Sequence, residues 1–119
     1  MSIEKNQKQR IVSDEQISSY NTINPLLNSV YNEVKVLSKK QPDVLFNVNK
    51  VRIINKLLEK ARELLKNETT ATHLEILDED SLPSNSDAVI ILSLYSSALD
   101  MFHKNYYDCS DLLGEEHWK

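Results

Sequence analysis

The scarcity of turn-forming residues is the strongest constraint on how this chain can fold. Its 119 residues include one glycine and three prolines. A fold of many short strands needs a turn former about every 8–12 residues, whereas long helices joined by a few loops need far fewer. A chain of this length can bury a core as one domain. The sequence therefore predicts an all-α protein: a small bundle of three long helices, with a short N-terminal helical turn and a C-terminal extension.

The first part of this bundle is predicted from capping residues and apolar spacing. After a polar arm at residues 1–12, Ser13 or Asp14 can cap a short helical turn. Asn24-Pro25 is a second start signal, since proline is well suited to the first position of a helix. Apolar residues then recur at three- and four-residue steps as far as Lys40. The sequence leaves open whether the turn and this helix are continuous through Pro25.

Asp43 is expected to cap the next helix, because Pro42 ends the preceding one. One apolar stripe runs from Val44 to Leu65, and the opposite face is charged. On that face, oppositely charged side chains three residues apart are expected to compensate one another: Lys56/Glu59, Glu59/Arg62, Lys60/Glu63 and Glu63/Lys66.

Residues 67–85 break the helical pattern and are predicted to form a loop that the apolar run Leu74–Leu77 pins to the bundle. The last long helix is predicted at Ser86–Tyr107, and it completes a bundle domain of residues 13–107. Residues 108–119 form an acidic tail with room for one further helical turn.

The Ser86–Tyr107 helix has more apolar surface than one core-facing stripe requires. Ile90, Leu94 and Met101 lie together beside an already complete stripe. Such a helix is either central in its bundle or covered by a partner. We expect a helix–helix interface with a protein partner, most simply a second copy in a homodimer. Trp118 is expected to contribute as an anchor, because tryptophan is favoured at interfaces.

Charge is divided unevenly along the chain. Residues 1–66 carry 12 Lys and Arg against 7 Asp and Glu, a balance of +5, and residues 67–119 carry 2 against 11, a balance of −9. The two halves are expected to attract each other, within one chain or across a dimer. A secondary contact is expected at the acidic loop, formed by Asp78, Glu79 and Asp80.

Two other functions compete with this interpretation. A nucleic-acid-associated regulator would use the basic helix at 50–66, whose cationic residues are Lys50, Arg52, Lys56, Lys60 and Arg62. An acidic helical inhibitor, of the immunity-protein or antitoxin type, would use the acidic half to mask a basic site.

No pattern predicts catalysis or a cofactor. One glycine excludes glycine-rich phosphate-binding loops. His103, Cys109 and His117 lack the close pairing of zinc ligands, and the acidic neighbours of Cys109 disfavour a reactive thiolate. A lone cysteine and the absence of a long apolar segment are typical of a soluble cytoplasmic protein. The sequence thus favours a non-catalytic interaction module.

Overall fold

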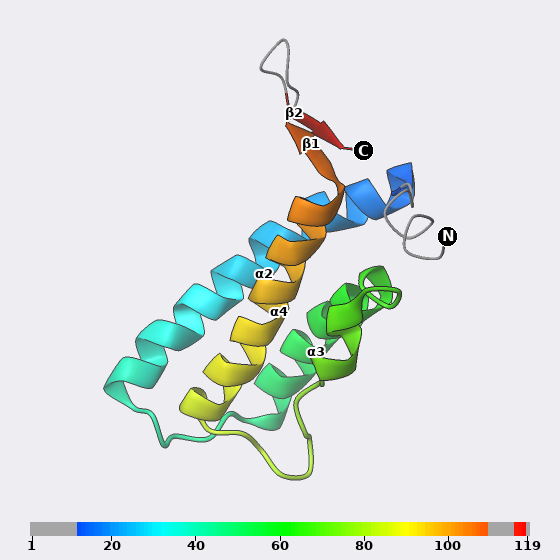
Figure 1. Ribbon diagram of the computed structural model, residues 1–119. Coiled ribbons are helices and arrows are strands. Elements are labelled where there is room, and N and C mark those ends of the chain that lie inside the picture. Colours follow the sequence, from blue (N-terminus) through cyan, green and yellow to red (C-terminus); the bar gives the residue numbers. More distant parts are fainter. Residues whose placement is uncertain (1–11, 110–115, 119) are drawn as a thin grey trace.

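Three long helices make up most of the computed structural model, which describes residues 12–109 and 116–118 (Figure 1). They are α2 (Asp14–Lys40), α3 (Val48–Leu64) and α4 (Asn85–Tyr106). The predicted all-α bundle is confirmed.

The predicted separate N-terminal turn is not confirmed, because α2 is one continuous helix. It begins with a capping box: the Gln16 N–H donates to Ser13 Oγ (3.0 Å), and the Ser13 N–H donates to Gln16 Oε1 (2.9 Å). The start signal at Asn24-Pro25 lies inside this helix. A proline in a helix interior costs about 3 kcal/mol. Tyr20 and Leu27, buried on either side of it, belong to one core stripe that offsets this cost.

The predicted start of α3 at Asp43 is wrong by one turn. Asn47 is the cap, and its Oδ1 accepts the Lys50 N–H at 2.8 Å. The residues between Asp43 and Asn47 are extended, because their backbone pairs with the start of α4. Leu45 and Ser84 form an isolated antiparallel bridge there. Hydrogen bonds to a distant segment therefore replace the first helical turn.

The same contact brings the start of α4 slightly earlier than predicted. Ser84 is the cap, with its Oγ accepting the Asp87 N–H at 3.1 Å. Asn85 is buried, and its side-chain amide donates to the Gln41 carbonyl at 2.9 Å. The chain entering α4 is thus tied to the chain leaving α2.

The connection between α3 and α4 is pinned to the bundle, as predicted. Leu74 and Leu77 are 3% and 2% exposed. Asn55 of α3 holds the backbone of Leu77 by two hydrogen bonds of 2.8 Å, donating to its carbonyl and accepting its N–H. From the other side, the Tyr95 hydroxyl of α4 donates to the Glu75 carbonyl at 2.8 Å. This segment therefore bridges α3 and α4.

Two kinds of short element were not predicted. A 3₁₀ helix, η1, spans Thr69–His73. Beyond α4, β1 (Tyr107–Cys109) and β2 (Glu116–Trp118) form an antiparallel pair in place of a further helical turn. The predicted N-terminal arm lies outside the described residues, apart from Val12, which is buried.

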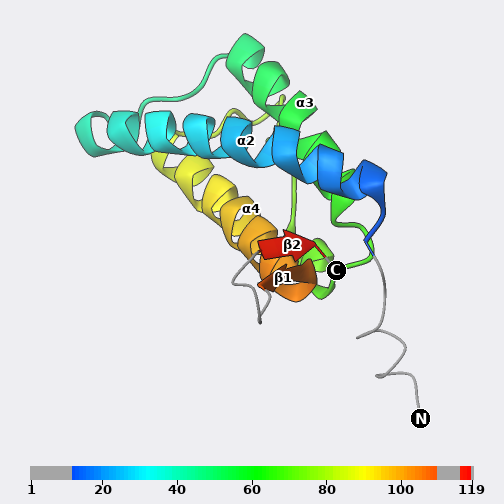
Figure 2. The ribbon, with the colours of Figure 1, turned by 90° about the horizontal axis from the view of Figure 1, so that it is seen from above.

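The core lies where α2 packs against both α3 and α4. Seen from above, α3 passes across α2, and α4 runs at an angle to α2 (Figure 2). Near the β1–β2 pair the core is aromatic: the ring of Phe102 lies 5.8 Å from that of Tyr20 and 5.0 Å from that of Tyr106. Within residues 12–109 and 116–118, no helix has both the length and the apolarity needed to cross a membrane.

Candidate interaction surfaces

The outward face of α4 carries the three apolar residues singled out in the sequence. Ile90 is 61% exposed, Leu94 43% and Met101 46%, whereas Leu92 and Leu99 on the opposite face are fully buried. We call Ile90, Leu94 and Met101 the α4 stripe. The helix is therefore not enclosed by its own bundle, and its excess apolar surface faces outward.

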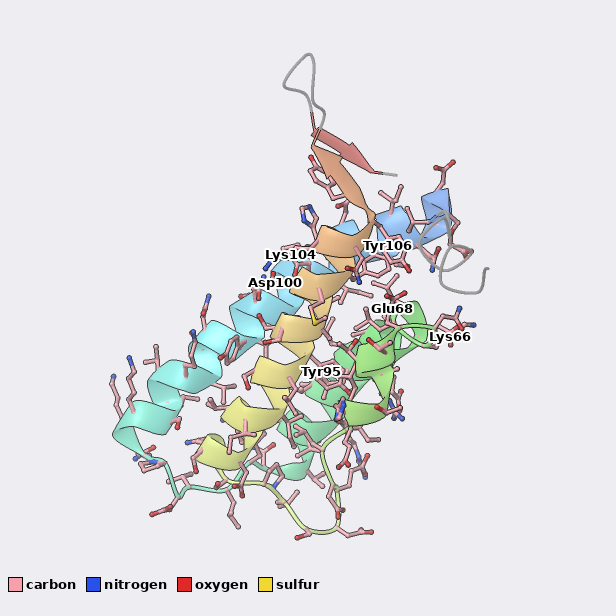
Figure 3. All side chains as sticks on the ribbon, in the orientation of Figure 1. Lys66, Glu68, Tyr95, Asp100, Lys104 and Tyr106 are labelled. Carbon is pink, nitrogen blue, oxygen red and sulfur yellow. The ribbon has the colours of Figure 1, made fainter. Side chains whose placement is uncertain are left out.

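The members of the α4 stripe lie four and seven residues apart on one face of the helix, with the exposed Ser97 between Leu94 and Met101. Ser93 adds little polarity to this face, since its hydroxyl donates to the Ile90 carbonyl at 2.7 Å. Asp100 and Lys104 occupy successive turns of α4 (Figure 3). The stripe is thus an apolar ridge with charged residues near it.

Trp118 cannot be placed on this surface. Its backbone belongs to β2, opposite Tyr107, and its side chain is outside the described part of the structure. Its role as an anchor stays a prediction.

The acidic loop is partly engaged in holding its own conformation. Asp78 Oδ1 accepts the N–H groups of Asp80 (2.8 Å) and Ser81 (3.2 Å). Glu79 pairs with Arg52 Nε at 3.1 Å, and both side chains are substantially exposed. These contacts give Asp78 and Glu79 structural roles, and a contact between this loop and a partner remains a prediction.

The structure separates the five predicted basic residues. Lys50, Lys56 and Lys60 line cavities between α2 and α3. Arg52 pairs with Glu79 of the loop, and Arg62 lines a different cavity together with Leu74. A single nucleic-acid-binding face would need these cations side by side, and the fold brings only the three lysines together.

The expected compensation of these charges along α3 is mostly missing. Of the four oppositely charged pairs predicted there, one forms an ion pair among the described residues, Lys66 Nζ to Glu63 Oε2 at 2.7 Å. Lys56 and Lys60 are in no ion pair within this part of the chain.

Sequence reasoning missed an apolar groove between α2 and α3. Two adjoining cavities of ≈ 350 and ≈ 320 Å³ share Val30, Ile53 and Ile54 in their lining. We call this the α2–α3 groove. Its most exposed apolar members are Leu26 (53%) and Ile53 (66%), with Leu57 half-buried beside them. The sequence feature that could have revealed this groove is Ile53, an apolar residue that lies outside the stripe predicted for this helix.

The titratable groups with perturbed pKa values are structural. Burial raises the pKa of Tyr95 to about 12, although Arg62 nearby opposes the shift. Burial, with a smaller effect of Asp100, raises the pKa of Tyr20. Among residues 12–109 and 116–118, no three His, Cys, Asp or Glu side chains gather as a metal site would require. Burial in the core accounts for both tyrosine shifts, and the apolar surfaces are the candidate functional sites.

Comparison of the chain with protein-family models, with curated proteins and with solved structures finds no significant match.

Proposed function

We propose that this protein is a non-catalytic interaction module that self-associates through the α4 stripe. The observation that carries the proposal is the exposure of Ile90, Leu94 and Met101 on a helix whose opposite face is fully buried. Water contact with three large apolar side chains on one helix face is unfavourable, and exposed apolar patches can mark partner sites.

The available free energy points to a modest affinity. Fully burying a side chain of this size stabilises by about 1.5–3 kcal/mol. Because each member of the stripe is already about half-buried, covering it gains roughly 1 kcal/mol per side chain. Association must also overcome the loss of translational and rotational freedom. Self-association should therefore depend visibly on protein concentration.

The test replaces the whole stripe with a polar residue that suits a helix. The triple variant Ile90→Gln/Leu94→Gln/Met101→Gln should remain folded, because none of the three side chains is in the core. Sedimentation velocity over a range of concentrations should show association of the wild type and its loss in this variant. Val36→Gln is the matched control: Val36 is 51% exposed on α2 and lines neither cavity of the α2–α3 groove.

The two ways in which the proposal can fail are distinct. A wild-type chain that stays monomeric at the highest soluble concentration refutes self-association. A triple variant that associates as strongly as the wild type refutes the assignment to the α4 stripe. Circular dichroism of both chains checks that the helices are retained.

Nucleic-acid binding is the second candidate, favoured by the three lysines that the fold gathers beside the α2–α3 groove. Neutralising Lys50, Lys56 and Lys60 with glutamine should then abolish retention on heparin at low salt. Retention of the wild type that this variant loses, together with a monomeric wild type, would favour this candidate over self-association.

A further inference from the structure

We propose that the α4 stripe of one copy docks into the α2–α3 groove of another, so that the contact joins two different surfaces. This inference rests on the proposed self-association through α4 and identifies the surface that receives it. It makes the interface heterologous, because each copy supplies one stripe and one groove.

The two surfaces fit in shape. The stripe is a ridge on the outside of a helix, and a ridge buries both of its flanks when it lies in a groove. At 1.5 Å per residue, the Ile90–Met101 stripe is about 16 Å long. The α2 wall of the groove runs from Thr22 to Leu37, about 22 Å by the same rise. The groove is therefore long enough to hold the entire stripe.

The receiving surface has the apolar character that such a ridge needs. Ile53 lines both cavities and, at 66%, is the most exposed of the large hydrophobic residues in the described part of the chain. Leu26 stands on the α2 wall at 53% exposure. Neither residue belongs to the buried core. An incoming helix that covered both would remove their exposed apolar surface from water, which is favourable.

The α3 side of the groove is basic. Lys50, Lys56 and Lys60 line it, against one carboxylate on the α2 side, Glu33. Lys50 Nζ lies 5.9 Å from the centroid of the Phe46 ring. None of the three lysines is in an ion pair within the described residues. An occupant with carboxylates beside its apolar face would suit this rim.

Two carboxylates and one lysine flank the α4 stripe. Asp87 and Asp100 are exposed on the same helix, with Lys104 one turn beyond Asp100. Two copies of this ridge facing each other would form a convex contact, in which neither ridge covers the flanks of the other. The groove instead offers lysines and a concave surface. Asp87 and Asp100 belong to the acidic half of the chain and the three lysines to its basic half, so this contact pairs opposite charges.

A chain cannot fill its own groove with its own stripe. The buried face of α4, which includes Leu92 and Leu99, packs toward α2, and the stripe lies on the opposite face. In the described residues, one ion pair joins the basic and acidic halves of the same chain, Arg52 to Glu79. An α4 stripe that fills this groove therefore belongs to another copy.

The test uses one matched substitution on each surface. Ile53→Glu places a carboxylate in the groove, and Ile90→Glu places one on the stripe; the two isoleucines are similarly exposed, at 66% and 61%. A carboxylate buried against apolar surface should weaken association at least about tenfold. Each variant alone should be monomeric by sedimentation velocity at concentrations where the wild type associates.

An equimolar mixture of the two variants is the decisive sample. The Ile53→Glu chain keeps an intact stripe, and the Ile90→Glu chain keeps an intact groove. One contact can therefore form between the two variants, and the mixture should contain dimers but no larger assemblies. Val36→Glu, at a residue of comparable exposure outside the groove, should associate like the wild type. Helix content by circular dichroism should be the same for all chains.

Other results would overturn the inference in recognisable ways. If Ile53→Glu alone associates like the wild type while Ile90→Glu does not, α4 pairs with something other than the groove, and the proposed function survives. If both variants are monomeric and their mixture stays monomeric, the two surfaces are not partners. If the wild type is monomeric, both the proposed self-association and this inference fail.

Discussion

Replacing Asn55 with alanine should detach the 74–77 segment from α3. Asn55 is 6% exposed, and its side chain makes two buried hydrogen bonds of 2.8 Å with the backbone of Leu77. An unsatisfied buried polar group costs about 1–3 kcal/mol, and this substitution leaves two of them, although water can reach the freed segment in part. We expect the free energy of unfolding to fall by about 3 kcal/mol. That is a large share of the roughly 5–15 kcal/mol typical of a folded domain.

Two measurements distinguish this mechanism from a general loss of packing. Urea denaturation gives the change in the free energy of unfolding, and amide hydrogen exchange reports on Leu77, whose N–H is held by Asn55 Oδ1. Exchange at Leu77 should accelerate far more in Asn55→Ala than exchange at amides in the middle of α2. Such a difference would show that the segment opens locally before the bundle unfolds.

Asn55→Asp provides a test of the hydrogen-bond donor alone. An ionised aspartate can accept the Leu77 N–H, but it cannot donate to the Leu77 carbonyl, which it would repel. Its destabilisation relative to wild type should be large at neutral pH and should shrink in acid, where the protonated carboxyl regains a donor. If Asn55→Ala costs less than about 1 kcal/mol and leaves exchange at Leu77 unchanged, then Leu74 and Leu77 hold the segment by burial and the reasoning is wrong.

Three further substitutions test other parts of the structure. The raised pKa of Tyr95, about 12 against the usual 10.0, means that stability present below pH 10 is lost as the pH rises toward 12, by up to roughly 3 kcal/mol. Tyr95→Phe should lack this alkaline loss in denaturant titrations at each pH, and an equal loss would contradict the assignment. Pro25→Ala should raise the free energy of unfolding by up to about 3 kcal/mol, because it restores a donor inside α2; an unchanged urea midpoint would mean that the helix already accommodates the ring. Arg52→Ala should cost less than about 1 kcal/mol in the same assay, since the Arg52–Glu79 pair is exposed, and a larger loss would show that the pair anchors the loop.

Local patterns in the sequence were sufficient for the fold class and for one of the two surfaces. One glycine and three prolines leave few places for the chain to turn, and apolar spacing near 3.6 residues then locates the helices. The same spacing separated Ile90, Leu94 and Met101 from the core stripe of the last helix, and all three are exposed. It also identified Leu74–Leu77 as a loop segment held by its leucines. These features depend on residues within a few turns of each other.

The features that sequence reasoning missed depend on contacts between distant segments. Pro25 lies inside α2 because Tyr20 and Leu27, on either side of it, are buried on one stripe of the helix. This burial outweighs the helix start signal at Asn24-Pro25. Hydrogen bonds to the start of α4 hold the residues after Asp43 in an extended form, which moves the start of α3 to Val48.

The α2–α3 groove is the clearest example of a feature that depends on contacts between distant segments. The sequence contains every residue that lines it, yet periodicity along one helix says nothing about the angle and separation between two helices. That geometry is set by how α2 packs on α3 and α4 together. The sequence by itself therefore determined the helices and the ridge on α4, because these follow from local repeats. The tertiary structure alone determined that the α2–α3 groove exists and that Lys50, Lys56 and Lys60 line it.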